Sequence, residues 1–170
     1  AQEAFSSRIV ALAEAHDLLT RENWEGAELH DVTARVAALH GGPGRFDLSG
    51  PSIRLSPKSA LSLSMALHEL ATNAMKYGAL STPVGRVHVS WALAPDPGAA
   101  RVDLTWTETG GPPVSQTPTR TGFGSSLASL SVEGQLGGRL VRDWRPAGLR
   151  ILVDLPATAL SRRRAAEKSH

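Results

Sequence analysis

The chain has 170 residues, of which 41% are hydrophobic, enough for one domain with a sizeable core. It has no cysteine, which excludes a disulfide framework and a thiolate metal site, and its net charge of +2 does not indicate a nucleic-acid partner. No apolar run approaches the length of a membrane span, so we expect a cytoplasmic chain without membrane contact.

Helices are predicted at the beginning of the chain. Residues 2–19 place apolar side chains on one side of a helix, and residues 28–39 form a second helix. Three glycines and a proline within residues 40–44 end that second helix. We therefore expect helices ahead of the first strand.

A short β-hairpin is predicted next. Residues 45–48 and 52–55 each alternate polar and apolar side chains, which is typical of strands. Gly50 and Pro51 lie between them and suit a turn. The pattern therefore predicts that the two segments pair with each other.

A long helix over residues 57–77 is the most informative element. Ser56 suits its N-cap, Pro57 its first turn and Gly78 its C-terminal end. A narrow apolar stripe, which we expect to face the core, is formed by Leu63, Leu67, Leu70 and Ala74.

The flank of this helix carries chemistry. Glu69, Asn73 and Lys76 stand at positions i, i+4 and i+7, so their side chains lie along one face, with Tyr77 between that face and the stripe. A general base, a magnesium ligand and a phosphate-binding cation in one row suit phosphoryl transfer. The alternative is an ordinary amphipathic helix with a solvated polar side.

Two strands and a long connection follow. Residues 85–94 and 101–108 alternate in the manner of strands and are separated by a Pro-Gly turn. Residues 109–121 show no periodicity, and a connection of this length is typical of a functional lid or of a disordered segment. The residues expected to face the core are Val87, Val89, Trp91 and Leu93 on the first strand and Val102, Leu104 and Trp106 on the second.

The C-terminal part predicts a helix over residues 125–136 and a hairpin of residues 139–144 and 149–155. Strands joined by hairpins, beside helices that can cover one face, favour an α+β fold. We expect a two-layer α/β sandwich with a mixed, mostly antiparallel sheet.

Three separated segments have the composition of one binding site. The first is the flank of the long helix. In the second, the Glu108 carboxylate can accept a hydrogen bond from an exocyclic amine, and Gly110 and Gly111 let a flat ring approach the backbone. In the third, Gly122 and Gly124 precede a helix whose free N–H groups can hold phosphate.

With these motifs the chain resembles the catalytic, ATP-binding region of a sensor histidine kinase of the GHKL superfamily, which has the Bergerat fold. More narrowly it resembles the HWE type, marked by a His in the N-box, here His68, and by a Trp-x-Glu motif, here Trp106 and Glu108. The resemblance covers nearly the whole chain. It implies an enzyme, a histidine protein kinase that uses ATP and Mg2+ in a two-component system.

The resemblance implies a role for each candidate residue. Asn73 would coordinate the Mg2+ that bridges the ATP phosphates, Glu69 would act as base or orienter, and Lys76 would contact phosphate. Glu108 would bind the adenine amino group, and the connection after Pro112 would be the ATP lid. The implied ATP-binding residues are Asn73, Lys76, Tyr77, Glu108, Gly110, Gly111, Pro112, Gly122, Phe123, Gly124, Ser125 and Leu127.

The resemblance also divides the chain. Residues 1–42 would be the end of a helical dimerisation and phosphotransfer region, residues 43–157 the catalytic ATP-binding domain, and residues 158–170 a basic tail. No histidine has the sequence context of the phosphoacceptor, so we expect transfer to a histidine outside this chain. The implied partners are a response regulator receiver domain, a phosphoacceptor helix of the same or a partner subunit, and a second copy held through the N-terminal helices.

Alternatives stay open for several residues. On the helical wheel, His68 lies about 120° from the flank that carries Glu69 and Asn73. A packed or hydrogen-bonded position inside the protein is therefore favoured over contact with ATP. Trp106 alternates with apolar residues, which favours a core position over a stacking platform. Lys76 could equally be a solvated cation at the end of a helix.

Two other functions share these features. One is a GHKL ATPase or a serine kinase that acts on a partner protein. The other is a degenerate nucleotide-binding module that only holds a partner. The presence of Glu69, Asn73 and both glycine elements argues against degeneracy.

Overall fold

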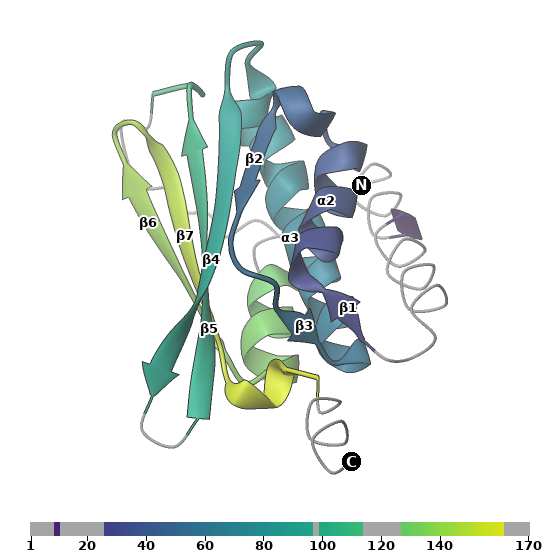
Figure 1. Ribbon diagram of the computed structural model, residues 1–170. Helices are drawn as coiled ribbons and strands as arrows, with labels where there is room; N and C mark the ends of the chain where they lie inside the picture. Colours follow the sequence, from purple (N-terminus) through teal and green to yellow (C-terminus); the bar gives the residue numbers. More distant parts are fainter. Residues whose placement is uncertain (1–8, 11–25, 97–98, 114–126, 162–170) are drawn as a thin grey trace.

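A computed structural model describes residues 9–10, 26–96, 99–113 and 127–161 of the chain. Figure 1 shows two layers, with a five-stranded sheet on one side and the helices α2 (Leu29–Leu39) and α3 (Pro57–Tyr77) on the other. The predicted two-layer α+β sandwich is therefore confirmed. Ser56 caps α3 as predicted, since its side chain accepts a hydrogen bond from the Ser59 backbone N–H.

The large sheet has the strand order β2-β4-β5-β7-β6. Strand β2 runs parallel to β4, and the other neighbouring pairs are antiparallel, so the sheet is mixed and mostly antiparallel as predicted. The last four strands lie within two residues of their predicted bounds. The strands are β2 (Phe46–Ser49), β4 (Arg86–Asp96), β5 (Ala99–Thr109), β6 (Arg139–Arg145) and β7 (Gly148–Leu155).

The predicted hairpin of residues 45–48 and 52–55 is wrong. Strand β2 pairs with β4, whereas β3 (Arg54–Leu55) pairs with β1 (Ala27–Glu28) in a separate two-stranded sheet. The indole of Trp91 packs against Gly50 and donates a hydrogen bond of 2.8 Å to the carbonyl of Pro51. Because of these contacts, the chain at residues 50 and 51 passes from the large sheet to the small one. It does not turn back on itself there as a hairpin would.

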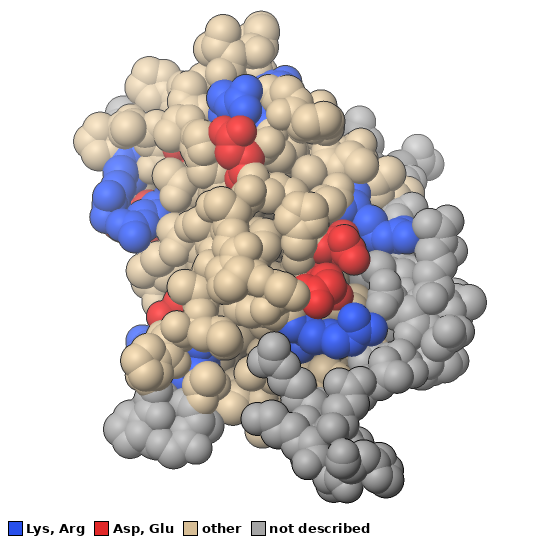
Figure 2. Space-filling model, viewed as in Figure 1, with Lys and Arg blue, Asp and Glu red and all other residues tan. Residues whose placement is uncertain are grey.

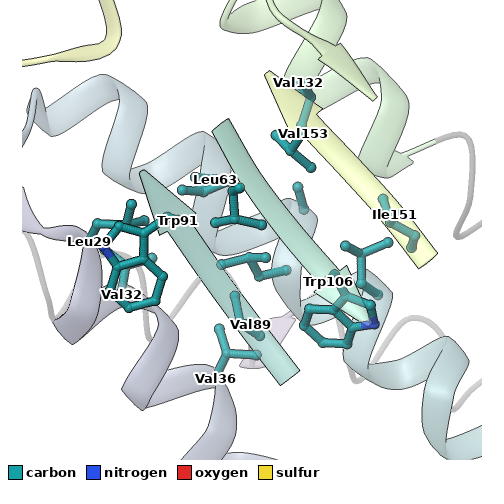
Figure 3. Packing of buried hydrophobic residues seen from close by; sticks show 14 of the residues in the cluster. Leu29, Val32, Val36, Leu63, Val89, Trp91, Trp106, Val132, Ile151 and Val153 are labelled. Carbon is teal, nitrogen blue, oxygen red and sulfur yellow. The ribbon is translucent and has the colours of Figure 1, made fainter. Parts of the chain in front are cut away.

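One hydrophobic core joins the sheet to both helices. The predicted stripe of α3 is buried, and the core also includes Leu29, Val32 and Val36 of α2. Figure 3 shows these α2 residues facing Trp91 and Val89 across the layer boundary. Helix α2 therefore packs in the same core as the residues that follow position 43.

Leu93 departs from the predicted inward set, because its side chain is 46% exposed. The other predicted inward residues of β4 and β5 are buried. Strand β2 ends opposite Ser90, so at Leu93 the described strands pair with β4 only on its β5 side, and β4 is an edge of the sheet there.

The C-terminal helix and tail differ in detail from prediction. The helix is described from residue 127, its last six residues (Leu130–Gln135) form a π-helix, and its predicted start lies outside the described residues. In the predicted tail, Ala159 is buried and Leu160 forms a bridge to Leu55.

Of the predicted first helix, only residues 9–10 are described, and they are helical. Within the described ranges, no helix has the length and apolar character needed to cross a bilayer.

The buried stripe of α3 gives a first prediction. Leu67→Ala should lower the free energy of unfolding by about 3 kcal/mol, because Leu67 is 1% exposed and its loss leaves a cavity against the sheet. Leu93→Ala, the same change at the exposed edge, should cost under about 1 kcal/mol. Urea denaturation of both variants measures the difference, and equal losses would contradict the assigned core.

Candidate functional site

The end of α3 and the end of β5 meet through a buried carboxylate. Glu108, one residue before the end of β5, is 5% exposed. Its Oε1 accepts a hydrogen bond of 3.0 Å from the backbone N–H of Ala79, just beyond α3. In Figure 1 the two element ends lie at the same end of the molecule, at the top of the view. The structure thus brings the second predicted site segment against the C-terminal end of the helix whose flank forms the first.

Glycines make this junction sterically possible. A Cβ on Gly78 would lie 2.0 Å from Oε1 of Glu108, and a Cβ on Gly111 would lie 2.7 Å from the Cα of Ala79. Gly110 has φ = 74°, in the left-handed region that side chains other than glycine rarely adopt. The glycines after β5 therefore let two stretches of backbone approach each other closely.

The Trp-x-Glu motif has a direct structural meaning. Trp106 and Glu108 stand two residues apart in β5, so their side chains point to the same face. The indole Nε1–H of Trp106 donates a hydrogen bond of 3.0 Å to Oε2 of Glu108. Trp106 is 1% exposed and lies at one end of the core cluster beside Ile151, so its predicted core position is confirmed (Figure 3).

The surroundings of Glu108 shift its acidity. Burial raises the pKa of the Glu108 carboxyl, and the hydrogen bonds from the Ala79 backbone and the Trp106 indole partly oppose that rise. Each oxygen of this carboxylate accepts one hydrogen bond from the protein.

The flank of α3 runs from the interior to the surface. Glu69 is 7% exposed, Asn73 is half-buried, and Lys76 is exposed. The Asn73 side chain makes no hydrogen bond within the described part of the chain. Tyr77, one of the implied ATP-binding residues, is 78% exposed.

His68 occupies the interior position that was favoured for it. Its side chain is 3% exposed, and its Nδ1 lies 3.2 Å from Nε2 of His40, at the end of α2. Burial and the nearby His40 lower the pKa of His68 to about 4, and burial lowers the pKa of His40. Sequence reasoning missed His40, because nothing in the spacing connects a residue after one helix to the middle of the next.

The phosphate-side segment is only partly described. Gly122, Phe123, Gly124 and Ser125 lie outside the described residues, Leu127 is half-buried, and Pro112 is exposed. Among the residues that the structure does describe, no group of three or more His, Asp or Glu side chains could hold a metal ion.

Charged residues are distributed in small groups. On the face shown in Figure 2, the described Lys and Arg side chains gather in separate patches divided by uncharged residues. Asp47 is paired with Arg86 at 2.7 Å, and Asp154 is paired with Arg101. This face therefore offers no continuous basic band of described residues.

The Trp106–Glu108 hydrogen bond gives the second prediction. Trp106→Phe should lower the free energy of unfolding by about 2 kcal/mol through loss of a bond to a charged group, in addition to the cost of lost volume. The matched control is Trp91→Phe, which also removes a buried indole. The indole N–H of Trp91 donates to the neutral carbonyl of Pro51, and a hydrogen bond of that kind contributes about 1 kcal/mol. Urea denaturation of both variants should find the larger loss at position 106, and a larger loss at position 91 would contradict this.

The raised pKa of Glu108 gives the third prediction. Because the folded protein binds this proton more tightly than the unfolded chain does, the contribution of Glu108 to stability is complete below its ordinary pKa of 4.5 and is lost as the pH rises through the folded value. Glu108→Gln removes this titration. The stability of wild type relative to that variant should therefore fall as the pH rises from 4.5 toward neutrality, as measured by urea denaturation at several pH values. A relative stability that rises over this range would oppose the assignment.

Comparison with known proteins finds similar histidine kinases. Residues 1–52 match the HWE histidine kinase family. A blue-light-activated histidine kinase of Brucella ovis is 38% identical over 160 residues, which cover 93% of this chain and 32% of that protein. The chain thus spans about a third of the length of this curated relative.

Solved structures share the fold. The histidine kinase domain of the blue-light activated histidine kinase from Erythrobacter litoralis has a TM-score of 0.68 and 16% identity, covering 90% of this chain and 74% of that one. The histidine kinase ThkA, in complex with the response regulator protein TrrA, has a TM-score of 0.56 and 16% identity, covering 91% of this chain and 49% of that one. The chain is therefore similar to HWE histidine kinases, and its described residues share the fold of the solved histidine kinase domains, the Bergerat fold.

Proposed function

We propose that this chain binds Mg-ATP and catalyses transfer of the γ-phosphoryl group to a histidine outside it. The observation that carries the proposal is the junction at Glu108, which brings the Trp-x-Glu segment against the end of the helix that bears Glu69 and Asn73. The names of the relatives support the same activity. The GHKL ATPase, serine kinase and degenerate-module alternatives gain no support from those names.

The adenine end of the nucleotide would lie at the junction. Each oxygen of a carboxylate has two lone pairs, so Glu108 can accept a further hydrogen bond from the adenine amino group while it keeps its bonds to the protein. Gly110, Gly111 and Pro112 would border the base, because they begin two residues after Glu108.

The phosphates and Mg2+ would lie along the flank of α3. The half-buried Asn73 carboxamide has no hydrogen-bond partner among the described residues, so its oxygen is open to a hard cation. Magnesium keeps several waters and takes few protein ligands besides phosphate oxygens, so a single amide oxygen fits it. Lys76 would contact phosphate from its exposed position, with Tyr77 next to it at the mouth of the site.

The third site segment would complete the phosphate side. The Gly122-Phe123-Gly124 turn, Ser125 and Leu127 would approach the phosphates from the start of the following helix, and the connection after Pro112 would be the lid. Only Leu127 of these five residues is described.

Glu69 would act on the incoming histidine. Its carboxylate would accept the ring N–H of that histidine while the other ring nitrogen forms a bond to the γ-phosphorus and the bond to the ADP oxygen breaks. The 7% exposure of Glu69 keeps the carboxylate in a low-dielectric setting, which strengthens such an interaction.

Partners follow from the same proposal. ThkA is seen in complex with a response regulator protein, and we propose a receiver domain as the final acceptor here. The phosphoacceptor helix would belong to the same or a partner subunit, and residues 1–42 would contribute to a dimer. Residues 43–157 would be the catalytic domain, residues 158–170 a basic tail, and the setting cytoplasmic.

Removal of the proposed magnesium ligand tests the proposal. Asn73→Ala should weaken the binding of a non-hydrolysable ATP analogue in the presence of Mg2+ by at least roughly tenfold, while binding without the metal changes little. Lys58→Ala, in the first turn of the same helix, is the control and should bind as wild type does. Calorimetric titration measures each affinity. Absence of binding by wild type, or an unchanged metal-dependent affinity in Asn73→Ala, would count against the proposed function.

A further inference from the structure

A short chain of polar contacts joins the end of α2 to α3. His40 places its Nε2 3.2 Å from Nδ1 of His68 and its Nδ1 3.2 Å from Sδ of Met75. The two imidazole rings meet edge to face with their centroids 5.4 Å apart. His68 and Met75 both belong to α3, and Glu69 directly follows His68.

The chemistry of the three groups fixes where the protons lie. The thioether sulfur of Met75 can only accept a hydrogen bond, so Nδ1 of His40 must carry a proton. Burial lowers the pKa of both histidines, in the case of His68 to about 4, so both rings are neutral near neutral pH. A neutral ring with a proton on Nδ1 has a lone pair on Nε2, and that lone pair must accept the Nδ1–H of His68.

The reverse arrangement is unfavourable at both ends. It would place the lone pair of His40 Nδ1 against the sulfur of Met75. It would also place a proton on Nε2 of His68, which is buried and has no hydrogen-bond partner among the described residues. Buried N–H groups without an acceptor are rarer in proteins than unfilled acceptors, so the proton of His68 belongs on Nδ1.

We infer that His40 is a positioning residue for α3: by accepting the Nδ1 proton of His68, it fixes that ring and the turn of the helix that carries Glu69 and Asn73. His40 itself follows α2, and α2 packs on α3 in the same core. The orientation of the proposed Mg-ATP site therefore depends on a contact from the preceding helix. The part of this inference that concerns nucleotide affinity rests on the proposed function.

The first test is spectroscopic and needs no activity. Nitrogen-15 NMR of the histidine rings in the 170-residue chain at neutral pH should find His68 with its proton on Nδ1 and an unprotonated Nε2. His40 should have the same tautomer. The signals that are absent from the spectrum of His40→Leu identify those of His40. A proton on Nε2 of His68 in wild type would overturn the inference.

The second test separates hydrogen bonding from packing. His40→Gln retains an acceptor oxygen for the His68 N–H, whereas His40→Leu fills similar space without one. The leucine variant should abolish the fixed tautomer and weaken binding of the Mg-ATP analogue by roughly tenfold. The glutamine variant should restore both toward wild type.

The outcomes are distinct. Equal behaviour of the leucine and glutamine variants would show that His40 acts through bulk alone and would end the inference. If His40→Leu does not fold, the wild-type tautomer and the glutamine variant still decide it. If wild type fails to bind the nucleotide, the proposed function is wrong, while the tautomer measurement still tests the contact between His40 and His68.

Discussion

One buried carboxylate joins the end of α3 to the end of β5. Glu108 accepts one hydrogen bond from the backbone just beyond α3 and another from an indole in its own strand. A buried acid is costly unless its oxygens are satisfied, and both donors stabilise the ionised form of this carboxyl. The junction between helix and sheet is therefore held by a polar contact that the hydrophobic core does not replace.

This constraint explains the composition of the neighbouring residues. A side chain at position 78 would collide with the Glu108 carboxylate, and Gly78 leaves that space open. Gly111 then brings the chain after β5 against Ala79, at the point where the proposed nucleotide base would lie. The Trp-x-Glu spacing agrees with the period of a strand, because residues two apart share a face. Family motifs in this chain thus have structural reasons of their own, beside any contact with nucleotide.

Local patterns predicted this structure well, and pairing between distant segments was predicted less well. The buried face of α3 and its N-cap could be predicted because the spacing of the apolar residues, Ser56 and Pro57 are all local signals. The segments beside Gly50 were correctly predicted as extended, but their partners are set by Trp91 and by Ala27–Glu28, which no local pattern reveals. Leu93 follows the alternation of its strand, yet the neighbouring strand ends before it.

The same distinction applies to the site. Glu69, Asn73 and Lys76 share a flank by helical geometry alone, but their burial differs from one end to the other because the sheet and α2 cover only part of α3. A buried acid is held in one orientation and in a low dielectric, which suits a group that must meet a reacting atom. An exposed lysine can follow a moving phosphate but contributes less to precise alignment. In the proposed site, the order of burial along α3 would therefore give Glu69 the task of orientation and Lys76 that of attracting phosphate by its charge.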